Sequence, residues 1–188
     1  MPRVGLDSEA VVTAAATLAD EEGLTALTLS TLAARLGVRA PSLYGHVDGL
    51  PDLRRRLATR GAGELNRAVR GAVAGQAGPD ALRAMAAAYR GYAHAHPGTY
   101  EAMQRAPEGP GAHADAAREL IVVFLAALAG YHLPEAEQIH AVRAVRAALH
   151  GFVALESEGG FRLPVALADS YARLVDMLDE GLHRLAEV

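Results

Sequence analysis

The chain has 188 residues, a formal net charge of −4 at pH 7, 51% hydrophobic residues and only 5% aromatic residues. This length allows one or two domains with a sizeable core. The absence of cysteine excludes disulfide bonds, thiolate metal ligands and thiol redox sensing. Because no long apolar run is present, we expect no signal peptide and no membrane span, and hence a cytoplasmic protein.

The pattern of apolar residues, glycines and prolines predicts an all-α fold. A first helix is expected over residues 8–22, and two short helices follow within residues 28–47. A long helix over 51–73, weakened by several glycines, is expected to end before a turn at Gly78-Pro79. Further helices are predicted over residues 80–96, from residue 97, and over 113–129, 134–157 and 164–186, with a loop at 106–111.

Residues 28–53, TLSTLAARLGVRAPSLYGHVDGLPDL, have the pattern of two short helices joined by a tight turn. Thr28 is placed to cap the first helix, and Gly37 follows where a helix commonly ends in a left-handed conformation. Pro41 suits the first turn of a second helix, in which Leu43 and Val47 face inward. The segment therefore has the form of a DNA-reading helix-turn-helix, with an ordinary helical hairpin as the alternative.

The charge around this segment differs from that of the whole chain. Six arginines and two aspartates between residues 35 and 60 give a local net charge of +4, although the chain is acidic overall. A basic face of this kind is typical of DNA-binding proteins. The alternative for the triplet at residues 54–56 is a solvated helix face without a DNA contact.

The segments GLTALTLSTLAARLGV and APSLYGHV, in this order and spacing, resemble the N-terminal domain of the TetR family of transcriptional repressors. The resemblance implies that Tyr44 and His46 hold the phosphate backbone, and Thr28 with its helix amides offers another phosphate site. Base contacts would come from the start of the second short helix and from one neighbouring residue, namely Arg39, Ala40, Pro41, Ser42 and Ser30.

Two departures from the family pattern concern these contacts. Arg39 stands where many members have a capping serine, so a phosphate contact is the alternative to base reading. The usual lysine at the start of the following helix is replaced by Gly49-Leu50-Pro51, so we expect that phosphate contact to be missing.

The C-terminal part shows a second, less specific resemblance. AHPGTYEAM at residues 95–103 and ALHGFVALESEGGF at 148–161 resemble the ligand-binding domain of a TetR subgroup named for a Trp-His-Gly signature, although the chain has no tryptophan. The two resemblances predict a DNA-binding domain at residues 1–50, a connecting helix at 51–78, and a ligand-binding and dimerisation domain at 79–188.

For dimerisation, the last two helices carry apolar stripes at helical spacing. Pairing them across a two-fold axis would form a four-helix interface and place two reading helices one DNA turn apart, about 34–36 Å. The stripe residues are Ala144, Ala148, Phe152 and Leu155 in one helix, and Leu167, Tyr171, Leu174, Leu178 and Leu182 in the other.

For ligand binding, we expect an apolar pocket with a few polar groups among the helices between residues 80 and 157. Its candidate residues are Tyr89, Tyr92, Met103, Phe124, Leu128 and His150. The alternative for each of these residues, taken singly, is a place in the ordinary core.

The sequence contains no HExxH motif, glycine-rich phosphate loop or GxSxG nucleophile motif, so we expect neither catalysis nor a cofactor. His94 and His96 lie two residues apart, which is unfavourable for binding one metal ion from a helix, and Glu156 and Glu158 are expected to be solvated acids.

The resulting hypothesis is a homodimeric repressor that binds a pseudo-palindromic double-stranded DNA operator and is released by a small apolar or amphipathic effector. The helix over 51–73 would connect the two functions. A metal-responsive regulator and a helical interaction protein that never touches DNA are the alternatives.

Overall fold

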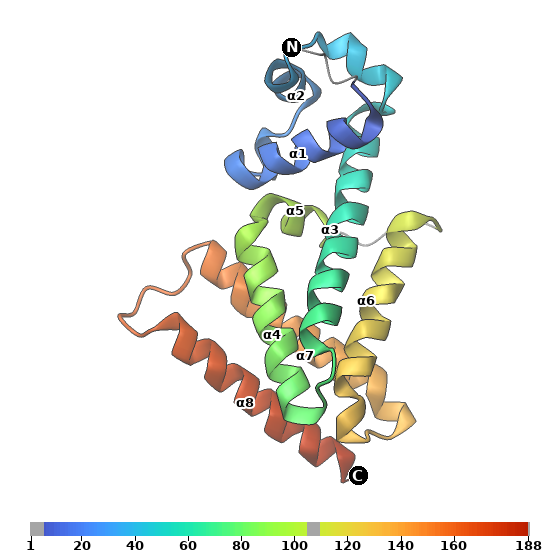
Figure 1. Cartoon of the computed structure of the whole chain (residues 1–188). Coiled ribbons are helices and arrows are strands. Elements are labelled where there is room, and N and C mark those ends of the chain that lie inside the picture. The colour runs from blue at the N-terminus through green and yellow to red at the C-terminus, as the bar shows by residue number, and fades with distance from the viewer. Residues whose placement is uncertain (1–5, 105–109, 188) are drawn as a thin grey trace. The chain divides into compact units, whose positions relative to one another are not determined.

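The computed structural model describes residues 6–104 and 110–187, and all regular elements in these ranges are helices (Figure 1). This confirms the expected all-α fold. Three short 3₁₀ helices, η1 (Leu24–Ala26), η2 (Ala40–Gly45) and η3 (Ala129–Tyr131), accompany the α-helices. The α-helices are α1 (Ser8–Glu22), α2 (Leu29–Leu36), α3 (Gly49–Val73), α4 (Gly78–Ala95), α5 (Pro97–Ala102), α6 (Ala112–Leu128), α7 (Glu135–Ser157) and α8 (Leu167–Ala186).

The chain divides into two compact units. The first comprises the described residues of Met1–Glu64 and Ala95–Ala117, and the second those of Leu65–His94 and Arg118–Val188. Residues 95–117 join the first unit because α5 packs against α1. The boundaries predicted near residues 50 and 78 divide the chain by expected function rather than by compactness, and they stay predictions.

The core of the first unit is formed by the apolar faces of α1, α2, η2 and the start of α3. Val11 and Ala15 of α1 are fully buried, as are Leu32 of α2, Leu43 of η2 and Leu57 of α3. Burial of such side chains contributes about 1.5–3 kcal/mol each for the larger ones. The two short elements α2 and η2 therefore depend on this shared core rather than on their own helix propensity.

The close approach of α5 to α1 depends on a residue without a side chain. A Cβ atom at Gly98 would lie 2.1 Å from the backbone oxygen of Ala19. Asp20, near the end of α1, accepts a hydrogen bond of 2.7 Å from the backbone N–H of Thr99, and its other oxygen lies 3.0 Å from Nδ1 of His96. The start of α5 is thus fixed directly against the end of α1.

The second unit contains α4, α7, α8 and the larger part of α6, which appear together in Figure 1. Tyr89 of α4 and Phe124 of α6 pack edge to face, with their ring centroids 6.2 Å apart. Tyr171 of α8 donates a hydrogen bond of 2.8 Å to the backbone oxygen of Ala86, which fixes α8 to α4. Leu149 of α7 is fully buried in the same core.

Most predicted helix ends agree with the structure within two residues, but the last helix begins later than expected. The proline at position 164 was expected to open a helix at residue 164, whereas α8 starts at Leu167 after an extended residue, Ala166. This prediction is wrong because a proline is compatible with a first helical turn but does not impose one. The loop predicted at 106–111 lies largely outside the described residues.

Within the described part of the chain, no single helix is long and apolar enough to cross a membrane. The helices Ala112–Tyr131 and Glu135–Ser157 meet that criterion only when taken together, and they are bent by 115° relative to each other.

Candidate nucleic-acid interface and ligand groove

The cap of α2 is built as the sequence predicts. Thr28 Oγ1 accepts a hydrogen bond of 3.1 Å from the backbone N–H of Thr31, and Thr31 Oγ1 accepts one of 3.0 Å from the N–H of Thr28. This reciprocal cap satisfies two backbone donors that a helix start otherwise leaves unpaired. A phosphate bound at the start of α2 would therefore contact the backbone N–H groups of the first turn that this cap does not use.

The turn after α2 directs the chain into η2. Gly37 has φ 66° and ψ 29°, a left-handed conformation that glycine adopts at little cost. The N–H of Val38 then donates 3.0 Å to the backbone oxygen of Ala33, which closes the end of the helix. Leu43 and Val47 are 0% and 2% exposed, which confirms their predicted inward orientation.

The second short helix is a 3₁₀ helix of six residues, with its proline in the first turn. Its end is held by Ser8 of α1, whose hydroxyl donates a hydrogen bond of 3.0 Å to the backbone oxygen of His46. A 3₁₀ helix of this length is not stable alone, so Ser8 and the buried Leu43 determine its position.

All eight residues predicted to contact DNA are accessible at least in part. The side chain of Tyr44 is 62% exposed, although its neighbour Leu43 is buried. Ala40 and His46 are half-buried, and the other five, Thr28, Ser30, Arg39, Pro41 and Ser42, are exposed. The structure therefore brings these residues onto α2, η2 and their flanks, while their individual roles stay predictions.

The local net charge of +4 counted along the sequence is offset in the folded chain by acids from outside the counted window. Arg35 forms ion pairs with Glu21 and Glu22, both of which lie outside the counted window. Arg60 pairs with Glu9 at 3.1 Å and with Glu64 at 2.8 Å. Adding these four glutamates to the two aspartates balances the six arginines, because folding brings acids from α1 and later in α3 beside them.

The arginines of this region differ in their partners. Arg55 and Arg56 both pair with Asp52, at 2.8 and 2.9 Å. Among the residues that the structure describes, Arg39 and Arg54 form no ion pair. Arg39, the residue that precedes η2, is also exposed, so its guanidinium is available for a DNA phosphate or a guanine edge.

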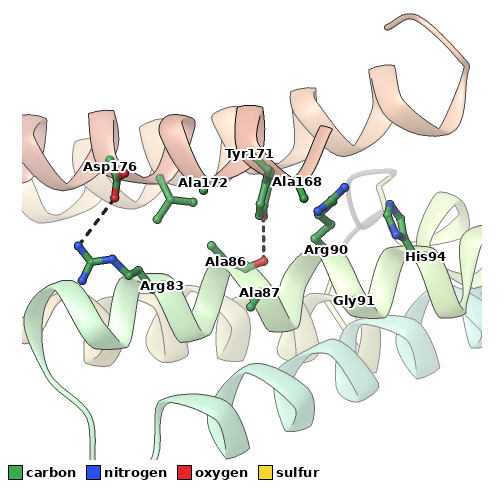
Figure 2. A pocket seen from close by; sticks show the side chains of 11 residues that line it. Arg83, Ala86, Ala87, Arg90, Gly91, His94, Ala168, Tyr171, Ala172 and Asp176 are labelled. Carbon is green, nitrogen blue, oxygen red and sulfur yellow. Dashed lines mark hydrogen bonds and ion pairs between the residues drawn. The ribbon is translucent and has the colours of Figure 1, made fainter. Parts of the chain in front are cut away.

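The second unit contains an open groove of about 440 Å³ between α4 and α8 (Figure 2). Its walls carry small residues, including Ala87 and Gly91 of α4 and Ala172 of α8. At one end of the groove Arg83 lies 3.8 Å from Asp176, and Tyr171 stands across the middle with its hydroxyl on the α4 backbone. Such a groove can receive an apolar body between polar ends.

The other end of this groove is an ion-pair cluster. Nε of Arg90 donates a hydrogen bond of 2.8 Å to Glu156 of α7, and Nε2 of His94 lies 2.8 Å from the same carboxylate. The Arg90 guanidinium also lies 5.0 Å from the ring centroid of Tyr171 and 5.9 Å from that of Phe152. Arg90 is thereby engaged both by a carboxylate and by two aromatic rings.

This cluster corrects the expectation that Glu156 is a solvated acid. Its side chain is only 11% exposed, and the hydrogen bond from Arg90 lowers the pKa of this carboxyl below its ordinary value. The same bond raises the pKa of Arg90, and burial raises the pKa of Tyr171. These directions keep Arg90 charged, Glu156 ionised and Tyr171 neutral near neutral pH.

The predicted effector residues lie mostly elsewhere. Tyr89, Tyr92, Phe124 and Leu128 are buried in the second unit, and Met103 belongs to the first unit. Burial lowers the pKa of the half-buried His150. Only Leu128 of this set lines one of the described cavities, a smaller one of about 400 Å³ that also contains His132 and Gln138.

Sequence reasoning missed the residues that line the α4 side of the groove. Arg83, Ala87, Arg90 and His94 recur at steps of four, three and four, which places them on one face of a helix. This spacing was available as a signal. The aromatic and apolar residues that suggest a pocket in the sequence form the core instead.

The predicted dimer residues differ in exposure. Tyr171 and Leu182 are buried within their own chain, so the expectation that these two residues form part of a surface stripe is wrong. Ala144 and Leu155 are exposed, and the half-buried members are Ala148, Phe152, Leu167, Leu174 and Leu178. Met177, which the stripe omitted, is 70% exposed on α8.

Histidine and acidic side chains do not gather in the described ranges into a group of three or more that could hold a metal ion. Nε2 of His94 lies 2.8 Å from the carboxylate of Glu156, and Nδ1 of His96 lies 3.0 Å from that of Asp20.

Comparison with known proteins matches residues 82–178 to the family model described as "Tetracyclin repressor-like, C-terminal domain". The uncharacterized HTH-type transcriptional regulator Rv0681 of Mycobacterium tuberculosis is 41% identical over 156 residues, 82% of this chain and 72% of the relative. The uncharacterized HTH-type transcriptional regulator YobS of Bacillus subtilis is 32% identical over 181 residues, 96% of this chain and 95% of the relative.

Solved structures share the fold. A protein of unknown function from Rhodococcus sp. RHA1 superimposes with a TM-score of 0.81 at 20% identity, covering 96% of this chain and 97% of that one. TetR from Acinetobacter baumannii AYE superimposes with a TM-score of 0.69 at 22% identity, covering 96% and 98%. These matches confirm the N-terminal helix-turn-helix and the C-terminal helical domain, but they do not confirm the Trp-His-Gly subgroup.

Proposed function

The chain belongs to the TetR family of helix-turn-helix transcriptional regulators, and on this premise we propose that it is a homodimeric, effector-released repressor acting in the cytoplasm. Its family model and both curated relatives are those of regulators, so the protein is a DNA-binding regulator and not an enzyme. The proposal concerns the operator, the assembly and the effector.

The observation that carries the DNA-binding proposal is the contrast in exposure and pairing among the residues of η2 and the residue that precedes it. Leu43 is fully buried, whereas the adjacent Tyr44 is 62% exposed and Arg39 has no ion pair within the described part of the chain. An exposed tyrosine and an uncompensated arginine on a short, anchored helix suit a phosphate contact and a contact with a guanine edge, respectively. We assign Arg39 to base reading, with Tyr44 and His46 as positioning contacts.

For assembly, we propose that α7 and α8 pair with the same helices of a second copy across a two-fold axis. The proposed interface contains the exposed Leu155 and Met177, together with the half-buried Leu174 and Leu178. An exposed methionine beside half-buried leucines is an apolar surface that pairing would cover. A palindromic operator would then meet two identical reading elements.

For the effector, we propose a site in the second unit. A TetR variant from Acinetobacter baumannii has been solved in complex with minocycline, which shows a small-molecule complex in a protein of the same fold. The groove between α4 and α8 suits an amphipathic ligand, because its Ala and Gly walls are apolar and its charged ends are polar. The effector-pocket residues predicted from the sequence that are buried in the core of the second unit would contact the ligand only after a rearrangement of that core.

The main experiment measures fluorescence anisotropy of labelled DNA from the region upstream of the coding sequence. We expect Arg39→Ala to weaken binding by about tenfold or more and to relax preference at one base position, as loss of a bidentate arginine–guanine contact does. Arg67→Ala, an exposed arginine of the second unit, is the matched control and is expected to have little effect.

Four outcomes would decide between the assignments. A loss that is equal across all sequences assigns Arg39 to phosphate, and no loss removes it from the interface. Absence of any DNA binding by the native protein favours the helical interaction protein instead. A change of DNA affinity with zinc or nickel alone favours the metal-responsive regulator.

The dimer is tested separately by light scattering at micromolar concentration. We expect the native chain to be dimeric and Met177→Glu to dissociate it, because a buried charge without a partner is costly. A monomeric native protein would contradict the proposed pairing of α7 and α8.

A further inference from the structure

The first unit contains a cavity that the proposed repressor function does not use. It measures about 380 Å³ and lies between η1, the start of α3, the end of α5 and the start of α6. Its apolar lining includes Leu24, Leu50, Ala58 and Ala102. Among the residues on its walls are two arginines, Arg54 and Arg55, of which only Arg55 has an ionic partner within the described ranges.

Arg54 is the unusual member of this lining. Its Nε is buried and makes no hydrogen bond, and its guanidinium forms no ion pair with any described residue. The neighbouring arginines differ, since Arg55 and Arg56 share the carboxylate of Asp52. Because Arg54 lines the cavity and its charge is not compensated by any described residue, an anion in the cavity would gain charge-assisted hydrogen bonds from its guanidinium.

The other polar groups around the cavity limit what that anion can be. Glu101 also lines the cavity and would repel a second negative charge on a ligand. His113 is half-buried, and burial lowers the pKa of its ring, so it adds hydrogen-bonding capacity without positive charge. Thr25 contributes a hydroxyl from η1.

We propose that this cavity binds a small amphipathic carboxylate, with the carboxylate on Arg54 and the apolar part against Leu24, Leu50 and Ala58. A carboxylate matches the planar fork of a guanidinium, and a single charge meets one uncompensated arginine. The volume lies within the range of about 300–1,000 Å³ that is usual for small-molecule sites. The site lies within the first unit and is therefore separate from the effector groove of the second unit.

The absence of tryptophan from the chain provides a direct test. Thr25→Trp introduces a single fluorophore at an exposed position beside the cavity, and octanoate serves as the probe. We expect a saturable change of tryptophan emission with octanoate and none with octylamine, which has the opposite charge. In the same background, Arg54→Gln is expected to raise the dissociation constant by about tenfold or more.

Two controls separate this site from other effects. Arg56→Gln removes a neighbouring arginine that does not line the cavity, and it should leave the dissociation constant unchanged within about twofold. A reporter in the second unit, Ala87→Trp in place of Thr25→Trp, should show no response governed by Arg54. Both readouts are independent of DNA, so failure here leaves the repressor proposal standing.

If Arg54→Gln does not fold, as judged by circular dichroism, Ala58→Leu tests the same proposal by filling the cavity while keeping the charge. Loss of octanoate binding in a folded Ala58→Leu variant supports the site. The proposal is overturned if octanoate gives no saturable change, if Arg54→Gln and Arg56→Gln weaken binding equally, or if inorganic phosphate binds as well as octanoate, which would make Arg54 a general anion contact.

Discussion

Arg39, directly before η2, and Arg90 of α4 show how differently the two units use the same side chain. Arg39 is exposed and has no ionic partner among the described residues, whereas Arg90 pairs with Glu156 and stacks near Tyr171 and Phe152. The guanidinium of Arg39 contributes little to the stability of the folded chain and is available to a ligand. The guanidinium of Arg90 already has a carboxylate and aromatic rings as partners within the chain.

The difference extends to how each unit is held together. In the first unit, α5 meets α1 through direct backbone contact at Gly98 and a carboxylate cap from Asp20. In the second, α8 meets α4 and α7 through aromatic rings and charged side chains, with Phe152 and Tyr171 centroids 5.0 Å apart. A close contact between two backbones leaves no space for an added side-chain atom. Contacts between long side chains can adjust to a substitution by a change of side-chain conformation.

The largest expected effect tests the backbone contact. We expect Gly98→Ala to lower the free energy of unfolding by about 3 kcal/mol or more, because its Cβ would meet the Ala19 backbone at 2.1 Å. Gly91→Ala on α4 is the control, since nothing lies within 4 Å of its added Cβ, and it should stabilise by about 0.5–1 kcal/mol. Similar urea midpoints for the two variants would contradict the conclusion that Gly98, unlike Gly91, is needed for a close backbone contact.

The second prediction compares the two arginines directly by urea unfolding. Arg90→Ala is expected to cost about 2 kcal/mol, since it leaves the 11% exposed Glu156 carboxylate with His94 alone among its described partners. The cost stays below that of a fully buried pair because Arg90 is 21% exposed. Arg39→Ala should change stability by less than about 0.5 kcal/mol. Equal losses would show that Arg39 is structural.

The smallest expected effect is a pH dependence confined to the second unit. The hydrogen bond from Arg90 lowers the pKa of Glu156 in the folded chain, so its contribution is complete above the ordinary value of 4.5. That contribution is lost as the pH falls from 4.5 through the lower folded pKa.

The measurement is the difference in unfolding free energy between the native chain and Glu156→Gln. It is followed from about pH 6 down to roughly two units below the ordinary carboxyl pKa. This difference cancels the titration of the other carboxylates. We expect it to shrink on acidification, and a constant difference would show that Glu156 acts through packing rather than through its charge.

Much of the first unit was predictable because its signals are local. The cap at Thr28, the left-handed turn at Gly37 and the inward Leu43 each follow from a residue and its near neighbours. The charge of the same region was not predictable by counting, since Glu9 and Glu21 reach Arg60 and Arg35 only in the folded chain. The buried state of Tyr171 likewise depends on α4, a partner distant in sequence.

By itself the sequence determined the helices, the helix-turn-helix and the family, because propensity, capping and apolar spacing act within a few turns of chain. Only the tertiary structure decided which arginines are already paired, that Gly98 lies against Ala19, and that a groove opens between α4 and α8. These features depend on contacts between residues far apart in the chain. The order of residues along the chain does not show which of these distant residues come close together in space.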